Sequence, residues 1–206
     1  MNNDKNLNSL LKWSIENSGP DVPADQRTHL TPDVIASLMG GPSDAELMKS
    51  AIELVIGSDP EVTLESKVTA MDNFEQIIES LDNANNIINL GLWAPLLSIL
   101  ESPEPELRRM AAWCIGTAVQ NNAPCQGHML AAGGMPPLVA MALKETEEKN
   151  VRKKAVYALS SACRNNQTSM DALLAELAKH GKTYGKINAE NMDEVDSVII
   201  PLKESI

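Results

Sequence analysis

Two blocks of this sequence repeat each other, and that repeat constrains the fold more than any other feature. Residues 107–122 read LRRMAAWCIGTAVQNN, and residues 151–166 read VRKKAVYALSSACRNN. The segments before them also match, because GLWAPLL at 91–97 aligns with GGMPPLV at 133–139. Self-similarity at a fixed spacing is typical of chains built from stacked copies of one structural unit.

A weaker third copy, KVTAMDNFEQIIESL, lies upstream at residues 67–81. Apolar residues recur in each copy at three- and four-residue spacing, which places them on one face of a helix. The period of about 42–44 residues is that of armadillo and HEAT repeats. One copy cannot bury its apolar face alone, so the copies must stack. The sequence therefore predicts an all-α, armadillo-like, right-handed helical solenoid.

The rest of the chain is predicted to divide around these repeats. We expect a flexible N-terminal segment at 1–25, capping helices at 26–62, the repeats at 63–180 and a C-terminal capping helix at 181–206. Within the repeats, a short helix is expected at 83–90, and the polar run DNANN at 82–86 is expected to join two helices.

Composition supports helices and narrows the choice of partners. Only 3% of the 206 residues are aromatic, and strands draw on aromatic and β-branched residues. The formal net charge of −11 disfavours nucleic acid and anionic membranes as partners. No run approaches the roughly 18 apolar residues of a membrane span, and no signal-peptide pattern is present. We expect a cytoplasmic, monomeric protein.

No residue pattern indicates catalysis, a cofactor or a metal site. The cysteines form no C-x-x-C pair or Cys/His cluster, and they are expected to be free thiols in a reducing compartment. The histidines have no nucleophile motif beside them. These residues are Cys114, Cys125, Cys163, His29, His128 and His180.

The residues opposite the apolar stripe of each long helix are expected to line the inner face of the solenoid. They form a ladder of polar and aromatic groups, which is the kind of surface that binds a partner. Trp113 and Tyr157 have a second interpretation, in which they pack over the neighbouring helix. The candidate residues are Asp72, Gln76, Glu79, Asn83, Trp113, Thr117, Gln120, Tyr157, Ser161 and Arg164.

The run at 82–86 is also open to two interpretations. Asn and Asp cap helices and tolerate turns, so the run fits a structural connection. The alternative is a loop that contacts a partner. The residues concerned are Asn83, Ala84, Asn85 and Asn86.

Three motifs carry a family resemblance. NSLLKWSIENS at 8–18, MDNFEQIIESLDNANNIINLGLW at 71–93 and RRMAAWCIGTAVQNN at 108–122 resemble the Fes-type nucleotide exchange factors of fungi. These are relatives of the heat-shock-protein-70-binding protein of animals. The resemblance continues to AENMDEVDSVIIPLKES at 189–205 and covers nearly the whole chain.

The resemblance implies an exchange factor that binds a heat-shock protein 70 chaperone. In the family, the armadillo core embraces lobe II of the nucleotide-binding domain and displaces it, so that ADP leaves, ATP enters and the client is released. The resemblance also favours the contact interpretation of residues 83–86. Some members carry further armadillo copies, whose contacts do not transfer to this chain.

The family's N-terminal segment is implicated in client release. In this sequence it corresponds to residues 1–25, and its apolar elements are Leu10, Leu11, Trp13 and Ile15.

Two other functions compete with this interpretation. An adaptor of the catenin or importin kind would bind an extended peptide along a regular asparagine ladder, but Thr117 and Ser161 stand where that ladder has asparagine. A hydrolase would need a convergent acid/base or metal cluster, and the sequence offers none.

Overall fold

The structure of the chain is a computed structural model that describes Trp13 and residues 41–206. It divides into two compact units, Met1–Ser43 and Asp44–Ile206, and the second contains all the repeats. In that second unit the described residues form helices and no strand. The expectation of an all-helical repeat region is therefore confirmed.

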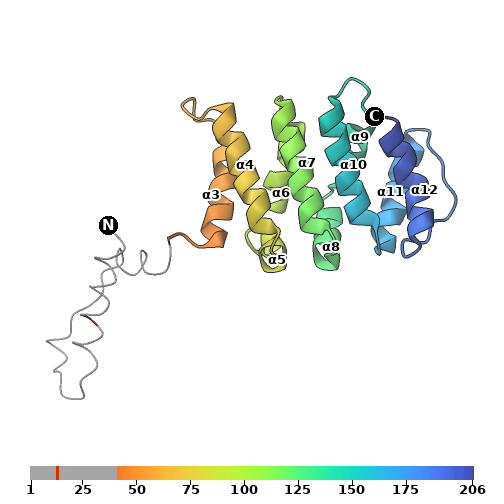
Figure 1. Cartoon of the computed structure of the whole chain (residues 1–206), viewed down its shortest axis with the longest axis horizontal. Coiled ribbons are helices and arrows are strands. Elements are labelled where there is room, and N and C mark those ends of the chain that lie inside the picture. The colour runs from red at the N-terminus through yellow and green to blue at the C-terminus, as the bar shows by residue number, and fades with distance from the viewer. Residues whose placement is uncertain (1–12, 14–40) are drawn as a thin grey trace, which may run out of the picture. The chain divides into compact units, whose positions relative to one another are not determined.

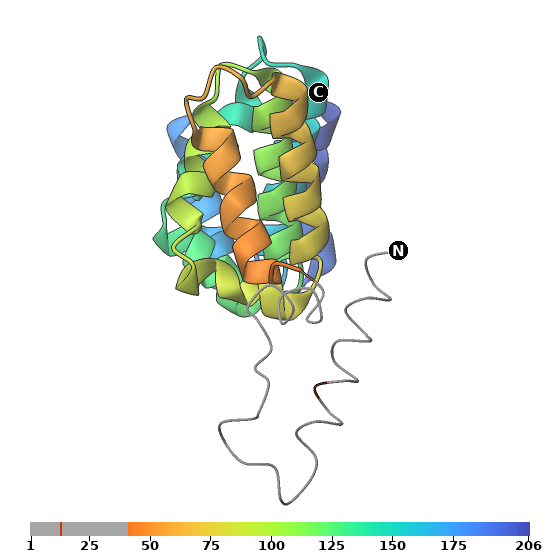
Figure 2. The ribbon, with the colours of Figure 1, turned by 90° about the vertical axis from the view of Figure 1, so that its left-hand side faces the viewer.

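Helices follow one another with short connections as far as α11, and a longer segment then leads to α12. Figure 1 shows α4, α7, α10 and α12 side by side on one face, with α6, α9 and α11 behind them; Figure 2 shows α3 beside α4 at the near end of the row. The elements are α3 (Asp44–Ile56), α4 (Leu64–Ile78), α5 (Leu81–Asn89), α6 (Trp93–Ser98), the 3-10 helix η2 (Ile99–Glu101), α7 (Pro105–Val119), α8 (Ala123–Ala131), α9 (Met135–Leu143), α10 (Lys149–Cys163), α11 (Gln167–Lys179) and α12 (Met192–Glu204).

The repeated asparagine pairs make the tight corner between a long helix and the next one. Asn121 and Asn165 have left-handed backbones, with φ of 51° and 58°, a conformation that asparagine tolerates better than most residues. The following residues, Asn122 and Asn166, are N-caps whose side chains accept the N–H three residues later. The NN motif therefore encodes one corner and one cap, and it recurs because the corner recurs.

In α4, α7 and α10, a basic side chain near the start of the helix forms hydrogen bonds to the end of the segment before it. Lys67, Arg108 and Arg152 occupy equivalent positions in α4, α7 and α10. Each donates to backbone carbonyls near the end of the preceding helix or in the connection after it, where the helix dipole is negative. The acceptors are Val55 and Gly57 for Lys67, Ser102 and Pro103 for Arg108, and Ala142 for Arg152.

The core runs along the row of long helices. The apolar stripe of α7, which includes Ala111, Ile115 and Ala118, is almost fully buried. Cys114, Cys125 and Cys163 are free and buried. Among the residues described, no helix has the length and apolar character needed to cross a bilayer.

Candidate partner-binding face

The polar and aromatic residues that the sequence predicted for the inner face lie on adjacent long helices. We call these side chains on α4, α7 and α10 the ladder face. Both α4 and α10 pack against α7, so the three rungs are neighbours. The ladder face comprises Asp72, Gln76, Glu79, Trp113, Thr117, Gln120, Tyr157, Ser161 and Arg164.

Hydrogen bonds between helices connect the rungs of the ladder face. The Thr117 hydroxyl donates to Glu75 Oε1 at 2.6 Å, which joins α7 to α4. The Tyr157 hydroxyl donates to Gln120 Oε1 at 3.0 Å, which joins α10 to α7. Glu75 is only 6% exposed, and sequence reasoning missed it because it adjoins the apolar stripe. These links hold neighbouring helices in a fixed relation.

The two aromatic residues both pack on neighbours and remain partly exposed. A Cβ placed on Gly116 would lie 2.4 Å from Cε1 of Tyr157, so the Tyr157 ring rests directly on the α7 backbone. Trp113 packs against the core with one part, and the Lys154 ammonium lies 3.4 Å from its ring centroid. The structure therefore combines the two interpretations that the sequence left open.

Two predicted residues on α10 have other contacts. Ser161 is 8% exposed and offers little surface to a partner. Arg164 forms an ion pair with Asp196 and donates to Met192 Sδ at 3.1 Å, so it attaches α12 to α10. Thr117 and Ser161 thus do not form an outward row like the asparagine ladder of a peptide-binding adaptor.

Residues 82–86 lie inside α5, so the short helix expected at 83–90 is confirmed and the interpretation of the run as a loop is wrong. The chain turns at Glu79 and Ser80, and Asp82 then sits in the first turn of α5, where the helix dipole favours a carboxylate. Ala84 is 2% exposed and faces the core. Its role as a contact residue stays a prediction, although its side chain has almost no free surface.

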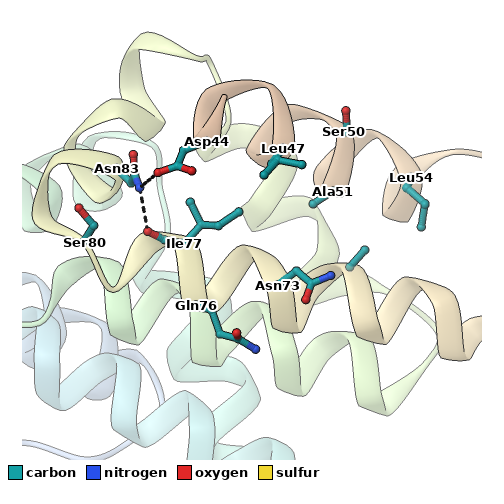
Figure 3. A pocket seen from close by; sticks show the side chains of 11 residues that line it. Asp44, Leu47, Ser50, Ala51, Leu54, Asn73, Gln76, Ile77, Ser80 and Asn83 are labelled. Carbon is teal, nitrogen blue, oxygen red and sulfur yellow. Dashed lines mark hydrogen bonds between the residues drawn. The ribbon is translucent and has the colours of Figure 1, made fainter. Parts of the chain in front are cut away.

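The asparagines of α5 bond mainly within the fold. Asn83 Nδ2 donates to Asp44 Oδ2 at 2.8 Å and to the Ile77 carbonyl at 3.1 Å, tying α5 to α3 and α4 (Figure 3). Asn85 Oδ1 accepts from Cys125 Sγ at 3.5 Å, and Asn86 Oδ1 accepts from Asn89 at 3.2 Å. The structural and contact interpretations are thus compatible, since Asn85 and Asn86 remain partly exposed.

A groove of about 640 Å³ separates α3 from α4, and sequence reasoning did not anticipate it. Leu47 and Leu54 of α3 line one wall and are 41% and 37% exposed. Figure 3 shows them across from Asn73 and Ile77 of α4. Gln76 and Asn83 also line the groove, so it adjoins the ladder face. One sequence signal could have revealed this groove. The helix α3 carries apolar residues on a side where the end helix of a solenoid would carry polar ones.

Of the apolar elements predicted in the N-terminal segment, Leu10, Leu11 and Ile15 lie outside the described residues. Trp13 is described and has a helical backbone. Among the described residues, no group of three or more His, Cys, Asp or Glu side chains could hold a metal ion.

Two family models together match most of the chain. Residues 7–87 match the model for the nucleotide exchange factor Fes1, and residues 83–181 match the SIL1/FES1/HPBP1 C-terminal domain.

Known structures agree on the fold. A designed armadillo repeat protein superposes with a TM-score of 0.53 at 18% identity, covering 93% of this chain and 79% of that one. An engineered protein gives 0.54 at 19% identity, covering 83% and 69%. The predicted armadillo-like fold is therefore confirmed.

Fungal relatives match nearly the whole of this chain. A protein of Gibberella zeae called Hsp70 nucleotide exchange factor FES1 is 54% identical over 98% of both chains. One of Neurospora crassa with the corresponding name is 47% identical over 97% of both chains. A third, from Eremothecium gossypii, is 39% identical over 95% of this chain and 71% of its own. The chain therefore belongs to the Fes1 family of nucleotide exchange factors.

Proposed function

We propose that this protein is a nucleotide exchange factor for a heat-shock protein 70 chaperone, and that it acts by binding and not by catalysis. The observation that carries the proposal is the 54% identity, over 98% of both chains, to a relative named for that activity. The ladder face supplies the means, because it presents aromatic and polar groups on firmly packed helices.

The proposed mechanism needs no contact with the nucleotide. The protein binds lobe II of the nucleotide-binding domain better in its open arrangement than in its closed one, and this difference in affinity lowers the affinity for ADP. Reciprocity requires that ADP or ATP on the chaperone weaken its binding to this protein. The Thr117–Glu75 and Tyr157–Gln120 bonds support this role, because helices fixed to one another resist adapting to the closed partner. The protein acts as a monomer in the cytoplasm.

The ladder face is the proposed contact surface, and its exposed members give the sharpest test. Glu79 and Gln120 are exposed, and Glu79 makes no side-chain hydrogen bond or ion pair within the described residues. Arginine at Glu79 changes the surface without filling the core or breaking a bond, whereas arginine at Gln120 also removes the acceptor of the Tyr157 hydroxyl. Arginine at Ala84 would be a poor test, because that side chain is buried and the variant would disturb α5 itself.

The decisive experiment measures release of a fluorescent ADP analogue from the chaperone. The wild-type protein is expected to accelerate release, Glu79→Arg and Gln120→Arg to do so less, and Glu101→Arg, an exposed position on η2 outside the ladder face, to act like wild type. Circular dichroism checks that all variants keep their helices. No acceleration by the wild-type protein refutes the function, whereas equal acceleration by all variants refutes only the surface.

The N-terminal segment, residues 1–25, is proposed to promote client release by competing for the client site. Its deletion is expected to leave ADP release unchanged and to slow the release of a labelled client peptide. A loss of both activities would mean that the segment belongs to the core.

A further inference from the structure

The first two turns of α10 are positively charged, although the protein as a whole is negative. The start of a helix also favours negative side chains. These two turns of α10 contain Lys149, Arg152, Lys153 and Lys154, and the helix has no carboxylate. The whole chain has 28 acidic and 17 basic residues. The start of a helix is the positive end of its dipole, so each cation there costs about 0.3–1 kcal/mol. By contrast, α3 and α12 begin with acidic residues. Such conflicts between local preference and sequence are typical of functional sites.

Only part of this charge is used inside the fold. Arg152 donates to the carbonyl of Ala142 and to that of Ser205. Lys149 and Lys153 are exposed, and neither forms an ion pair with any residue that the structure describes. Lys153 is the repeat equivalent of Arg109 on α7, so the two occupy matching rungs. The start of α10 therefore carries two exposed cations, Lys149 and Lys153, that have no anionic partner among the described residues.

Two further cations, those of Lys154 and Arg109, lie over the ring of Trp113. The Lys154 ammonium lies 3.4 Å from the Trp113 ring centroid, and the Arg109 guanidinium carbon lies 6.0 Å from it. Two carboxylates are near: Glu106 pairs with Arg109, and Glu75 of α4 is buried and accepts from Thr117. Burial, followed by the charge of Arg109, holds the pKa of Lys154 below its ordinary value, while Glu75 acts in the opposite direction. The cation is thus only partly compensated, and a further anion would stabilise it.

We propose that Arg109 and Lys154, which lie over the Trp113 ring, together with the exposed Lys153 of the same helix turn as Lys154, receive an acidic segment of the chaperone's nucleotide-binding domain. This inference rests on the proposed function and assigns a role to residues outside the predicted set. The α4 edge of the same face has the opposite sign, since it carries Asp72 and Glu79. A face with one basic and one acidic edge fixes the orientation of a partner and speeds its association.

The test compares two lysines with the same charge in different places. Lys153→Glu reverses an exposed charge next to Lys154 in α10, whereas Lys182→Glu reverses an exposed charge between α11 and α12. Binding to the nucleotide-binding domain is followed by stopped-flow fluorescence at several salt concentrations. Lys153→Glu is expected to weaken binding roughly tenfold, mainly through slower association, and to flatten the salt dependence. Lys182→Glu should change it less than about twofold.

The Lys153→Glu variant also separates binding from folding. A carboxylate near the start of α10 suits the helix dipole, so its melting temperature should equal or exceed that of wild type. For Lys154, arginine should keep binding and methionine should reduce it, because only arginine preserves the cation over Trp113.

Each outcome decides a different point. Equal binding by Lys153→Glu and Lys182→Glu overturns the inference while ADP release by wild type still supports the proposed function. A wild-type protein that does not bind the chaperone refutes both. If a single-stranded RNA oligonucleotide binds wild type and is lost with Lys153→Glu, while chaperone binding is unchanged, the basic residues serve nucleic acid instead and the inference is wrong.

Discussion

At the scale of residues, the ion pair between Arg108 and Glu147 joins α7 to the connection between α9 and α10. Arg108 Nε and Nη2 donate to the two carboxylate oxygens at 2.9 and 2.7 Å, and the Glu147 side chain is 3% exposed. Burial pushes the pKa of Glu147 upward, but the hydrogen bonds and charge of Arg108 outweigh it, so the pKa lies below its ordinary value of 4.5. The stability from this group is therefore complete above about pH 4.5 and is lost as the pH falls towards the lowered pKa.

Arg108→Met is expected to lower the free energy of unfolding by about 3 kcal/mol at pH 7, because it leaves the buried Glu147 carboxylate with only the distant Lys144 ammonium, at 3.9 Å, and the Glu148 N–H. Urea denaturation measures the change. Adding Glu147→Leu to this variant should recover part of the loss, since the uncompensated charge is then gone. A double variant less stable than Arg108→Met alone would contradict this account.

The ladder residues show how far a sequence can locate side chains. Periodicity placed Gln76, Glu79 and Gln120 on an exposed side of the long helices, and the structure agrees. It did not reveal that Arg164 bonds to Asp196, because α12 lies far along the chain and has no repeat counterpart. Glu75 was missed for a related reason, since its partner Thr117 belongs to another copy.

At the scale of elements, Gly116 sets how closely α7 and α10 approach. A Cβ there would lie 2.4 Å from the Tyr157 ring and 3.2 Å from the Ala158 Cα. Gly127, inside α8, has open space around the same position. Both are glycines within helices, so alanine brings each a propensity gain of about 0.8–1 kcal/mol. Only Gly116 has a neighbouring helix that opposes the added atom.

Gly116→Ala is therefore expected to lower the free energy of unfolding by about 1–3 kcal/mol, whereas Gly127→Ala should raise it by about 0.5–1 kcal/mol. Chemical denaturation of the two variants side by side measures both. Equal effects in the two proteins would show that the Tyr157 ring moves aside freely and that the contact between α7 and α10 is loose.

The elements themselves were largely predictable, and α5 shows where two signals in the sequence conflict. The proline-marked starts, the asparagine pairs and the glycine ends are local signals, and they recur in every clear copy. The run at 82–86 has the local composition of a turn, yet it is helical because Ala84 and Ile87 pack into the core. Burial of two apolar side chains outweighed the local preference of four polar ones.

At the scale of the whole second unit, stability should follow position in the row. In a solenoid each repeat contacts only its neighbours, so an inner helix is supported on two sides and an end helix on one. Among the described helices, α7 lies between α4 and α10, whereas α3 and α12 lie at the ends. Backbone amides of α7 and α10 are therefore expected to exchange with deuterium most slowly, and those of α3 and α12 fastest. The centre of the ladder face would then be its stiffest part, as discrimination between two arrangements of a partner requires.

Arg164→Ala tests whether loosening one helix affects only the helices next to it. The substitution removes the ion pair with Asp196 and the contact with Met192, which attach α12 to α10. Exchange in α12 should accelerate several-fold, while exchange in α4 and α7 stays at the wild-type rate, because neither touches α12 through this side chain. Faster exchange in all helices together would show one cooperative unit instead of a row of neighbours. In that case a change at α12 would reach the basic edge around Trp113, and a variant far from the partner would weaken binding as much as one within the contact.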